Sequence, residues 1–185
     1  MKIKLERKNC LYPMLTTLVG ANVNTRPNYA PIAFVGIMDF DHISVAINRN
    51  HYTNTGIKEN KTFSINIPSI DEVKKVDYCG LVSGRDIDKS RLFKTFYGVL
   101  STAPMVEECP INMECRLIQI IDFPRHEVFV GEVVEAYSDA QYLSQGKINL
   151  SKVQPILFSF HNKDYWKLDT SFAKAWDIGR QIQEV

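Results

Sequence analysis

The segments NMECRLIQIID (Asn112–Asp122) and EVFVGEVVEAY (Glu127–Tyr137) are two long predicted strands that decide the fold class. The first alternates apolar and polar side chains and then becomes apolar on both faces, and this period of two predicts a strand. Pro124-Arg125-His126 supplies a turn between the strands, because proline favours chain reversal. The second strand carries apolar residues on both sides, so one side must meet a helix or another subunit.

Shorter segments of the chain have the same strand character: Met14–Asn22, Ala30–Met38, Ile43–Asn48, Thr62–Ile67 and Ile156–Phe160. Turn residues separate the first three of them, at Thr25–Asn28 and at Asp39–His42. The strict alternation in Thr62–Ile67 predicts a half-buried strand.

Helices are predicted at Thr53–Asn60, from Ser69 to Gly80, at Asp88–Tyr97 and at Phe172–Ile182. Thr53 is the expected N-cap of the first, and the capping-box spacing of Ser69 and Glu72 opens the second, which Gly80 closes. Many strands with short helices in the connections, and no β-α-β alternation, predict a mainly β fold, a β-barrel with peripheral helices.

The composition argues against several function classes. Lys plus Arg number 22 and Asp plus Glu 21, so the formal net charge of +1 creates no field that would gather nucleic acid. No run of about 18 apolar residues is present that could cross a membrane, and no apolar signal core follows the basic N-terminus. At this length we expect a single domain, residues 1–185, located in the cytoplasm.

Cysteine and histidine spacing gives no metal site. The cysteines (Cys10, Cys79, Cys109 and Cys115) show neither CxxC nor zinc-finger spacing, so free thiols are expected, with Cys115 in the core. The histidines (His42, His51, His126 and His161) are scattered and are expected at the surface or in turns. The sequence also lacks the GxSxG, HExxH, P-loop and GxGxxG signatures.

One polar run, Asn48–Thr55, has the ingredients of an anion site. Arg49 offers a bidentate donor, and a helix predicted to begin at Thr53 presents free backbone N–H groups. A second loop, Cys79–Lys89, contains two glycines that let backbone approach a ligand closely. The alternatives are an ordinary solvated loop with a capping threonine in the first case, and a helix C-cap with a solvated turn in the second.

An ordered set of short patterns covers the chain from about Tyr12 to Arg180: Tyr12-Pro13, Asn28, Arg49 with Thr53, Phe63-Ser64-Ile65-Asn66, Cys79-Gly80, Ser83-Gly84, Asp88-Lys89, Tyr165-Trp166-Lys167-Leu168 and Ala175-Trp176-Asp177-Ile178-Gly179-Arg180. Taken together, this order resembles the flavoredoxin branch of the flavin-reductase-like proteins. The resemblance implies an FMN-binding split barrel that forms homodimers, with the flavin near the subunit interface.

The resemblance also implies which residues hold the cofactor. The flavin phosphate is expected against Arg49 and Thr53, with Asn48, His51 and Asn54 as neighbours. The flavin ring is expected along Tyr29, Ala30, Pro31, Ala46 and Ile47, and the loop from Ser83 to Lys89 is expected to close over the cofactor.

What the resemblance implies in function is an FMN-binding oxidoreductase of the flavin-reductase or flavoredoxin type. It would pass a hydride or electrons through the bound FMN, with NAD(P)H as a transient donor. Because the flavin carries the reaction, no catalytic residue is assigned. Two alternatives stay open: a flavin-carrying electron-transfer protein without a nicotinamide site, and a non-enzymatic β-barrel that binds another small ligand.

Overall fold

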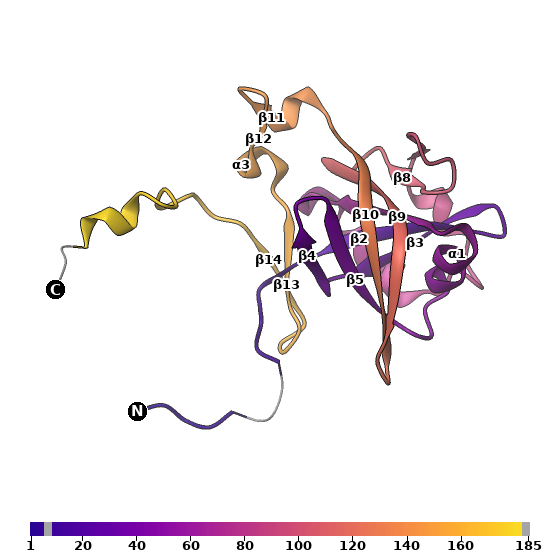
Figure 1. Cartoon of the computed structure of the whole chain (residues 1–185), viewed down its shortest axis with the longest axis horizontal. Coiled ribbons are helices and arrows are strands. Elements are labelled where there is room, and N and C mark those ends of the chain that lie inside the picture. The colour runs from indigo at the N-terminus through magenta and orange to yellow at the C-terminus, as the bar shows by residue number, and fades with distance from the viewer. Residues whose placement is uncertain (6–8, 183–185) are drawn as a thin grey trace.

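The computed structural model describes residues 1–5 and 9–182 and is mainly β (Figure 1), which confirms the predicted fold class. Its centre is an antiparallel sheet of seven strands in the order β3-β2-β6-β9-β10-β5-β4. The strands are β2 (Thr17–Val23), β3 (Arg26–Ile32), β4 (Val35–Asp39), β5 (His42–Asn48), β6 (Thr62–Ile67), β9 (Ile111–Asp122) and β10 (His126–Ser138). The two long strands predicted from the sequence are the adjacent strands β9 and β10.

The sheet coils into a barrel with one core inside it. Side chains from strands at opposite ends of the sheet order, such as Ile32 of β3 and Val45 of β5, belong to the same buried cluster as Phe63 and Phe129. Strands β3 and β5 contact each other although no strand ladder joins them. The barrel is therefore split along the line between β3 and β5.

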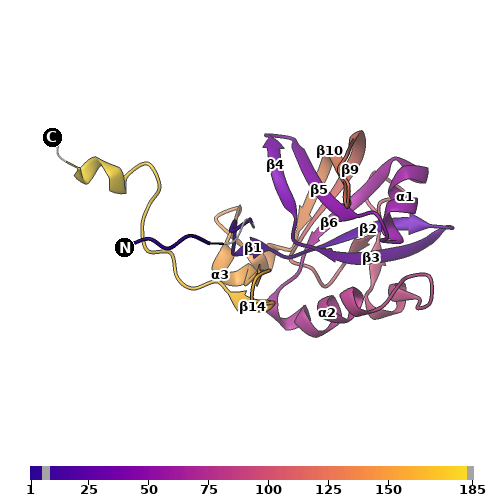
Figure 2. The same ribbon diagram turned by 90° about the horizontal axis from the view of Figure 1, so that it is seen from below.

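Two helices cover the barrel. The helix α1 (Thr53–Asn60) packs on β2, and α2 (Val73–Leu81) packs on β3 (Figure 2). A second buried cluster lies under α2, where Val76 and Cys79 of the helix meet Leu18 and Tyr29 of the sheet. Helix α2 thus covers the outer face of β3, whereas Ile57 of α1 belongs to the cluster inside the barrel, and β2 is buried at every position.

The remaining elements are short: β1 (Met14–Leu15), η1 (Ile70–Glu72), η2 (Lys89–Leu92), β7 (Thr95–Phe96), β8 (Met105–Val106), η3 (Ala140–Tyr142), β11 (Leu143–Ser144), β12 (Lys147–Ile148), α3 (Leu150–Val153), β13 (Ile156–Ser159), β14 (Asp164–Lys167) and η4 (Ile178–Gln181). Strands β1, β13 and β14 form a separate small sheet. No helix in the described part of the chain is long and apolar enough to span a membrane.

The predicted turns are partly wrong. The chain reverses at Asn24–Thr25, where both residues have positive φ (49° and 65°), while residues 26–28 already belong to β3. Such left-handed pairs suit the twist of a two-residue hairpin. The apolar run Ala30–Met38 is two strands rather than one, because the chain leaves β3 after Ile32 and enters β4 at Val35.

The predicted helix signals also need correction. Helix α1 spans Thr53–Asn60 as expected, but Tyr52 is the N-cap residue and Thr53 lies inside the helix. Ser69 caps only the short turn η1 and makes no side-chain capping bond. Helix α2 continues through Gly80 to Leu81. Strand β6 was expected to be half-buried but is buried on both faces, because the Pro104 region covers its polar side.

Two predicted helices are absent from the described residues. The segment Asp88–Tyr97 contains only the single turn η2 and the short strand β7. The segment Phe172–Ile182 contains only the turn η4, and Figures 1 and 2 show this end of the chain running away from the barrel. Phe172 and Trp176 are 99% and 94% exposed, so this segment does not cover β10 within its own chain.

Candidate functional site

Two cavities meet beside the split of the barrel, and they share Asn48 and His51. The first, here called the apolar cavity, has a volume of about 230 Å³. Pro31 of β3 and Ala46 of β5 line it, together with aromatic side chains of the β3–β4 connection, of the small sheet and of the β13–β14 turn: Phe34, Phe158, Phe160 and Tyr165. This lining suits a flat apolar ring system.

The second cavity, here called the polar cavity, has a volume of about 340 Å³. One wall is the start of α1 with the residues before it, from Asn50 to Thr53, and the other is the end of α2 with the loop after it, from Cys79 to Gly84. Asn28 of β3 and Lys89 of η2 complete the lining. Both of the segments that the sequence singled out, Asn48–Thr55 and Cys79–Lys89, therefore line one cavity, although residues 56–78 separate them in the chain.

The start of α1 gives the polar cavity an electropositive side. The first N–H groups of a helix have no partner within the helix and carry a partial positive charge. Thr53 is 1% exposed, and its Oγ1 accepts a hydrogen bond from Asn28 Nδ2 at 2.7 Å. Burial first, and then the charge of Lys89, lowers the pKa of His51, so that this imidazole is neutral near pH 7.

Lys89 is a buried cation of this cavity, with 5% of its surface exposed. Its Nζ donates to two backbone carbonyls, Tyr29 O at 3.1 Å and Cys79 O at 2.7 Å. Among the described residues no carboxylate forms an ion pair with it. Burial lowers the pKa of the Lys89 ammonium, which means that its charge is incompletely compensated and that an anion in the cavity would stabilise it.

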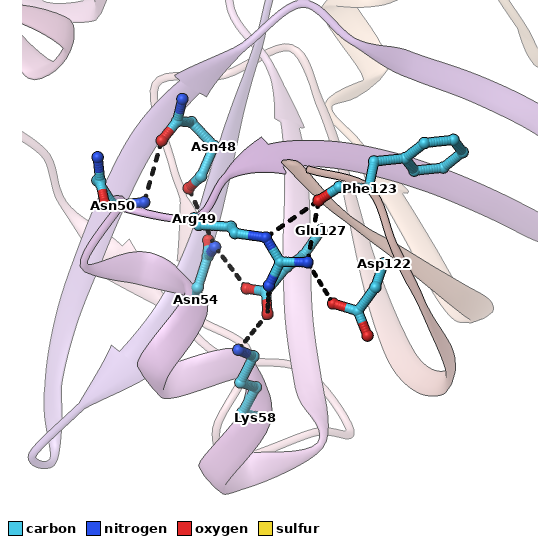
Figure 3. A network of polar contacts seen from close by, with 8 residues as sticks. All are labelled: Asn48, Arg49, Asn50, Asn54, Lys58, Asp122, Phe123 and Glu127. Atoms are coloured by element: carbon cyan, nitrogen blue, oxygen red, sulfur yellow. Dashed lines mark hydrogen bonds and ion pairs between the residues drawn. The ribbon is translucent and has the colours of Figure 1, made fainter. Parts of the chain in front are cut away.

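Arg49 has a different environment (Figure 3). Its guanidinium donates to Asp122 at 2.6 Å, to Glu127 at 3.3 Å and, through Nε, to the carbonyl of Phe123 at 3.0 Å. Glu127 is 5% exposed, and Lys58 Nζ also contacts it at 2.5 Å. Arg49 therefore neutralises carboxylates of the β9–β10 turn, and its role toward a phosphate stays a prediction.

The other predicted phosphate residues divide between the cavity and this ion-pair network. Asn48 lines both cavities, and Ser83 lines the polar one. Asn54 is 3% exposed, and its Nδ2 donates to the carbonyl of Asn48 and to Glu127 Oε2. Asn54 therefore links the network of Figure 3 to the start of α1.

The predicted ring residues divide by strand alternation, since neighbouring side chains of a strand point to opposite faces. Pro31 and Ala46 line the apolar cavity. Ala30 and Ile47 are 1% and 0% exposed and belong to the barrel core. Tyr29 is buried under α2, where its hydroxyl lies 2.8 Å from Thr95 Oγ1.

Several lining residues were missed by the sequence analysis: Phe34, His126, Phe158, Phe160 and Tyr165. Phe158 and Phe160 were read only as part of a late strand, and Tyr165 only as part of a family pattern. Their rings lie against one another, with centroids of Phe34 and Phe160 5.9 Å apart and those of Phe158 and Tyr165 5.7 Å apart. The dense aromatic composition of this late segment was the available signal.

One group of possible metal ligands occurs among the described residues, at the turn between β4 and β5. Asp39, Asp41 and His42 place their ligand atoms within 4.8 Å of one another. Both aspartates are exposed, and His42 Nδ1 lies 2.5 Å from Asp41 Oδ1. This exposed group lies outside both cavities, and nothing further in the structure points to an ion there.

Comparison with known proteins places this fold and site in a family. The family model described as "Flavin reductase like domain" matches residues 9–166. The structure is similar to flavoredoxin from Methanosarcina acetivorans, with 43% identity, a TM-score of 0.95, and coverage of 97% of this chain and 98% of that one. It is also similar to flavoredoxin of Desulfovibrio vulgaris (Miyazaki F), with 32% identity, a TM-score of 0.91, and coverage of 97% and 100%.

A more distant likeness concerns the fold alone. An FMN-binding protein from Thermus thermophilus, solved with bound 1-cyclohex-2-enone, is 22% identical, with a TM-score of 0.80 and coverage of 94% of this chain and 100% of that one. The split barrel is thus retained where most of the sequence differs.

Proposed function

The chain belongs to the flavin reductase-like family, and from that premise we propose that it is an oxidoreductase that binds FMN and passes a hydride or electrons through it. One observation carries the proposal: an apolar cavity with aromatic walls adjoins a polar cavity that contains a helix N-terminus and a buried lysine. These two adjoining cavities match a ligand with an apolar ring and a polar chain that ends in a phosphate.

The residues present fit FMN. The isoalloxazine ring would lie in the apolar cavity over Pro31 and Ala46, and the phosphate would lie in the polar cavity near Thr53, Ser83 and Lys89. FMN has a single phosphate, which the start of α1 and the ammonium of Lys89 would bind together in the polar cavity. The distantly similar protein from Thermus thermophilus is an FMN-binding protein, which supports the choice of flavin.

The chemistry of such a site divides between cofactor and protein. When bound, the flavin supplies the electron and hydride chemistry. The aromatic walls would exclude water from one side of the ring, and the loop from Ser83 to Lys89 would hold the phosphate end. Neutral His51 lies where the two cavities meet and orients the ligand without adding charge. We assign no side chain as a general acid or base.

NAD(P)H is the proposed transient donor, on the basis of the family. A second candidate is a flavin-carrying electron-transfer protein without a nicotinamide site, and the similarity to two flavoredoxins over almost the whole chain favours keeping it. Anaerobic bleaching of the flavin bands by NADH or NADPH separates the two. Bleaching by a nicotinamide supports the reductase, and failure of both nicotinamides with a reducible flavin supports the electron-transfer protein.

The first experiment is a visible spectrum of freshly purified protein, followed by titration of FMN into the flavin-free protein. We expect flavin absorbance bands, or quenching of FMN fluorescence if the cofactor is lost on purification. A colourless protein that leaves FMN fluorescence unchanged at high micromolar concentration would rule out the proposed function. The buried thiols of Cys79, Cys109 and Cys115 form no disulfide, which agrees with a reducing compartment and supports the proposed cytoplasmic location.

We also propose a homodimer in which each flavin touches both subunits. Large apolar side chains are exposed beside the apolar cavity and along the C-terminal segment, including Phe160, Trp166, Phe172 and Trp176. A single chain leaves this surface uncovered, whereas a second copy would bury it. Light scattering over a dilution series tests this. FMN should shift the equilibrium toward the dimer, and a monomer that retains FMN at micromolar concentration contradicts the proposal.

A further inference from the structure

Asn28 of β3 lies at a boundary between cavities. On one side is the polar cavity, and on the other is a hollow of about 490 Å³ between the β2–β3 turn and residues 84–89, here called the outer cavity. The two cavities share Asn28, Tyr52, Gly84 and Lys89. A ligand that occupies the polar cavity therefore passes directly along this asparagine.

The carboxamide of Asn28 is only half satisfied. Its Nδ2 donates to Thr53 Oγ1 at 2.7 Å, which fixes the plane of the amide. Its Oδ1 is buried, and no donor among the described residues reaches it. The whole residue is 5% exposed. A buried acceptor without a partner is costly, and in a native protein such an atom calls for an explanation.

The chemistry of this orphan atom restricts its partner. A carbonyl oxygen accepts hydrogen bonds, so it needs a donor and would repel an ionised phosphate oxygen. The ring N–H of a flavin is a donor, but Asn28 does not line the apolar cavity where the ring would lie. The chain between ring and phosphate carries aliphatic hydroxyl groups, and these are donors that pass through the polar cavity.

Gly84 lies directly against this oxygen. A Cβ atom built on Gly84 would lie 1.9 Å from Asn28 Oδ1 and 3.0 Å from Tyr52 Cδ1. Only a residue without a side chain lets the loop lie this close to the amide without displacing it. The loop and the asparagine are therefore matched to one another, and both line the polar cavity, through which the hydroxyl-bearing chain would run.

We propose that Asn28 is a specificity-determining ligand residue, whose Oδ1 accepts a hydrogen bond from a ribityl hydroxyl group of the flavin. The inference rests on the proposed function and deepens it. The site then selects flavins by their polyhydroxyl chain as well as by ring and phosphate, and it binds an analogue without that chain less tightly.

The test compares riboflavin with lumiflavin, in which a methyl group replaces the ribityl chain. Neither ligand has a phosphate, so the contribution of Lys89 does not obscure the result. Asn28→Leu should weaken riboflavin binding by about five- to tenfold, the usual effect of one lost buried hydrogen bond, and should leave lumiflavin binding unchanged. Fluorescence quenching gives both dissociation constants.

Asn22→Leu is the matched control. Asn22 lies on the neighbouring strand and is 8% exposed, but its Oδ1 already accepts from the Tyr97 hydroxyl at 3.0 Å. It lines none of the three cavities described here. Its substitution should leave the affinity for both flavins unchanged. Asn28→Asp, which keeps an acceptor oxygen, should retain most of the riboflavin affinity lost in Asn28→Leu.

A second measurement needs no substitution. The unmodified protein is titrated with 2′-, 3′- and 4′-deoxyriboflavin, and one of these analogues should bind about five- to tenfold more weakly than riboflavin. Equal binding of all three analogues and riboflavin overturns the proposal, even if Asn28→Leu does not fold. Equal losses of riboflavin and lumiflavin in Asn28→Leu also overturn it. If the unmodified protein binds neither flavin, the proposed function itself has failed.

Discussion

The two cations of the candidate site, Arg49 and Lys89, were both predicted to lie near the cofactor, and the structure gives them contrasting surroundings. Arg49 is at the exposed β9–β10 end of the barrel, with Asp122 and Glu127 as fixed partners. Lys89 is buried, and its described partners are neutral carbonyl groups of Tyr29 and Cys79.

This difference shows that a cation contributes to phosphate binding only if other groups of the protein do not already neutralise its charge, even where it belongs to a sequence motif. A guanidinium already paired with carboxylates gains little from a further anion, because its charge is neutralised and its donors are in use. A buried ammonium with carbonyl partners keeps a free proton and an uncompensated charge. We therefore expect Lys89, rather than Arg49, to dominate phosphate binding.

The largest expected effect is that of Lys89→Met on FMN binding. Loss of a charge-assisted hydrogen bond to phosphate costs about 1.5–3 kcal/mol, which corresponds to roughly ten- to a hundredfold in affinity. Riboflavin, which lacks the phosphate, should lose much less. Fluorescence titration of both ligands measures the difference. Lys74→Met, at an exposed lysine of α2, is the control, and equal losses of FMN and riboflavin in Lys89→Met would contradict the assignment.

The pH dependence of FMN affinity in the unmodified protein should show the titration of Lys89. Burial lowers the pKa of Lys89 in the ligand-free protein, and a bound phosphate raises it again. Affinity that depends on this proton is complete below the lowered pKa and falls as pH rises through it, by up to about tenfold per pH unit. FMN affinity should therefore decline already below the ordinary lysine range. The Lys89→Met protein should lack this decline. If FMN affinity depends on pH in the same way in both proteins, Lys89 is not the phosphate-binding cation.

Arg49→Ala should have a smaller effect on FMN than Lys89→Met, about two- to fivefold, because carboxylates already hold the guanidinium. Among the described residues, the substitution also leaves Glu127 with Lys58 as its one cationic partner, so the melting temperature should fall. Calorimetry and FMN titration on the same samples separate the two effects. A loss of FMN affinity larger than that of Lys89→Met would reverse the roles of the two cations.

The smallest effect is expected for Thr53→Ala, about two- to threefold in FMN affinity, since the backbone N–H groups at the start of α1 remain in place. Thr53→Ser keeps the hydroxyl group that accepts from Asn28 and is the matched control. Titration with FMN compares the three proteins. A tenfold loss in Thr53→Ala alone would show that the side chain, rather than the helix start, holds the ligand.

The sequence by itself determined the elements that depend on local patterns. Alternation and apolar runs predicted β5, β6, β9 and β10 to within a residue, because the side chains of a strand alternate between its two faces. The bounds of α1 were also predicted to within a residue. The sequence also predicted the free thiols of Cys79, Cys109 and Cys115 and singled out the two segments that line the polar cavity. The family resemblance supplied the flavin, which periodicity alone does not reveal.

The tertiary structure decided everything that depends on residues far apart in the chain. Phe172–Ile182 has the composition of an apolar helix, yet it leaves the barrel, because a short apolar segment becomes helical only against a surface that buries it. The sequence pattern suggested an Arg49 available for phosphate, but in the fold β9 and β10 place Asp122 and Glu127 beside it. The fold also brings Thr53 and Gly84 against Asn28. Thr53 pairs with Nδ2, while Oδ1 is buried without a hydrogen-bond partner among the described residues. Sequence patterns report local periodicity, whereas the partners of a charge or a buried amide are set by the coiling of the sheet.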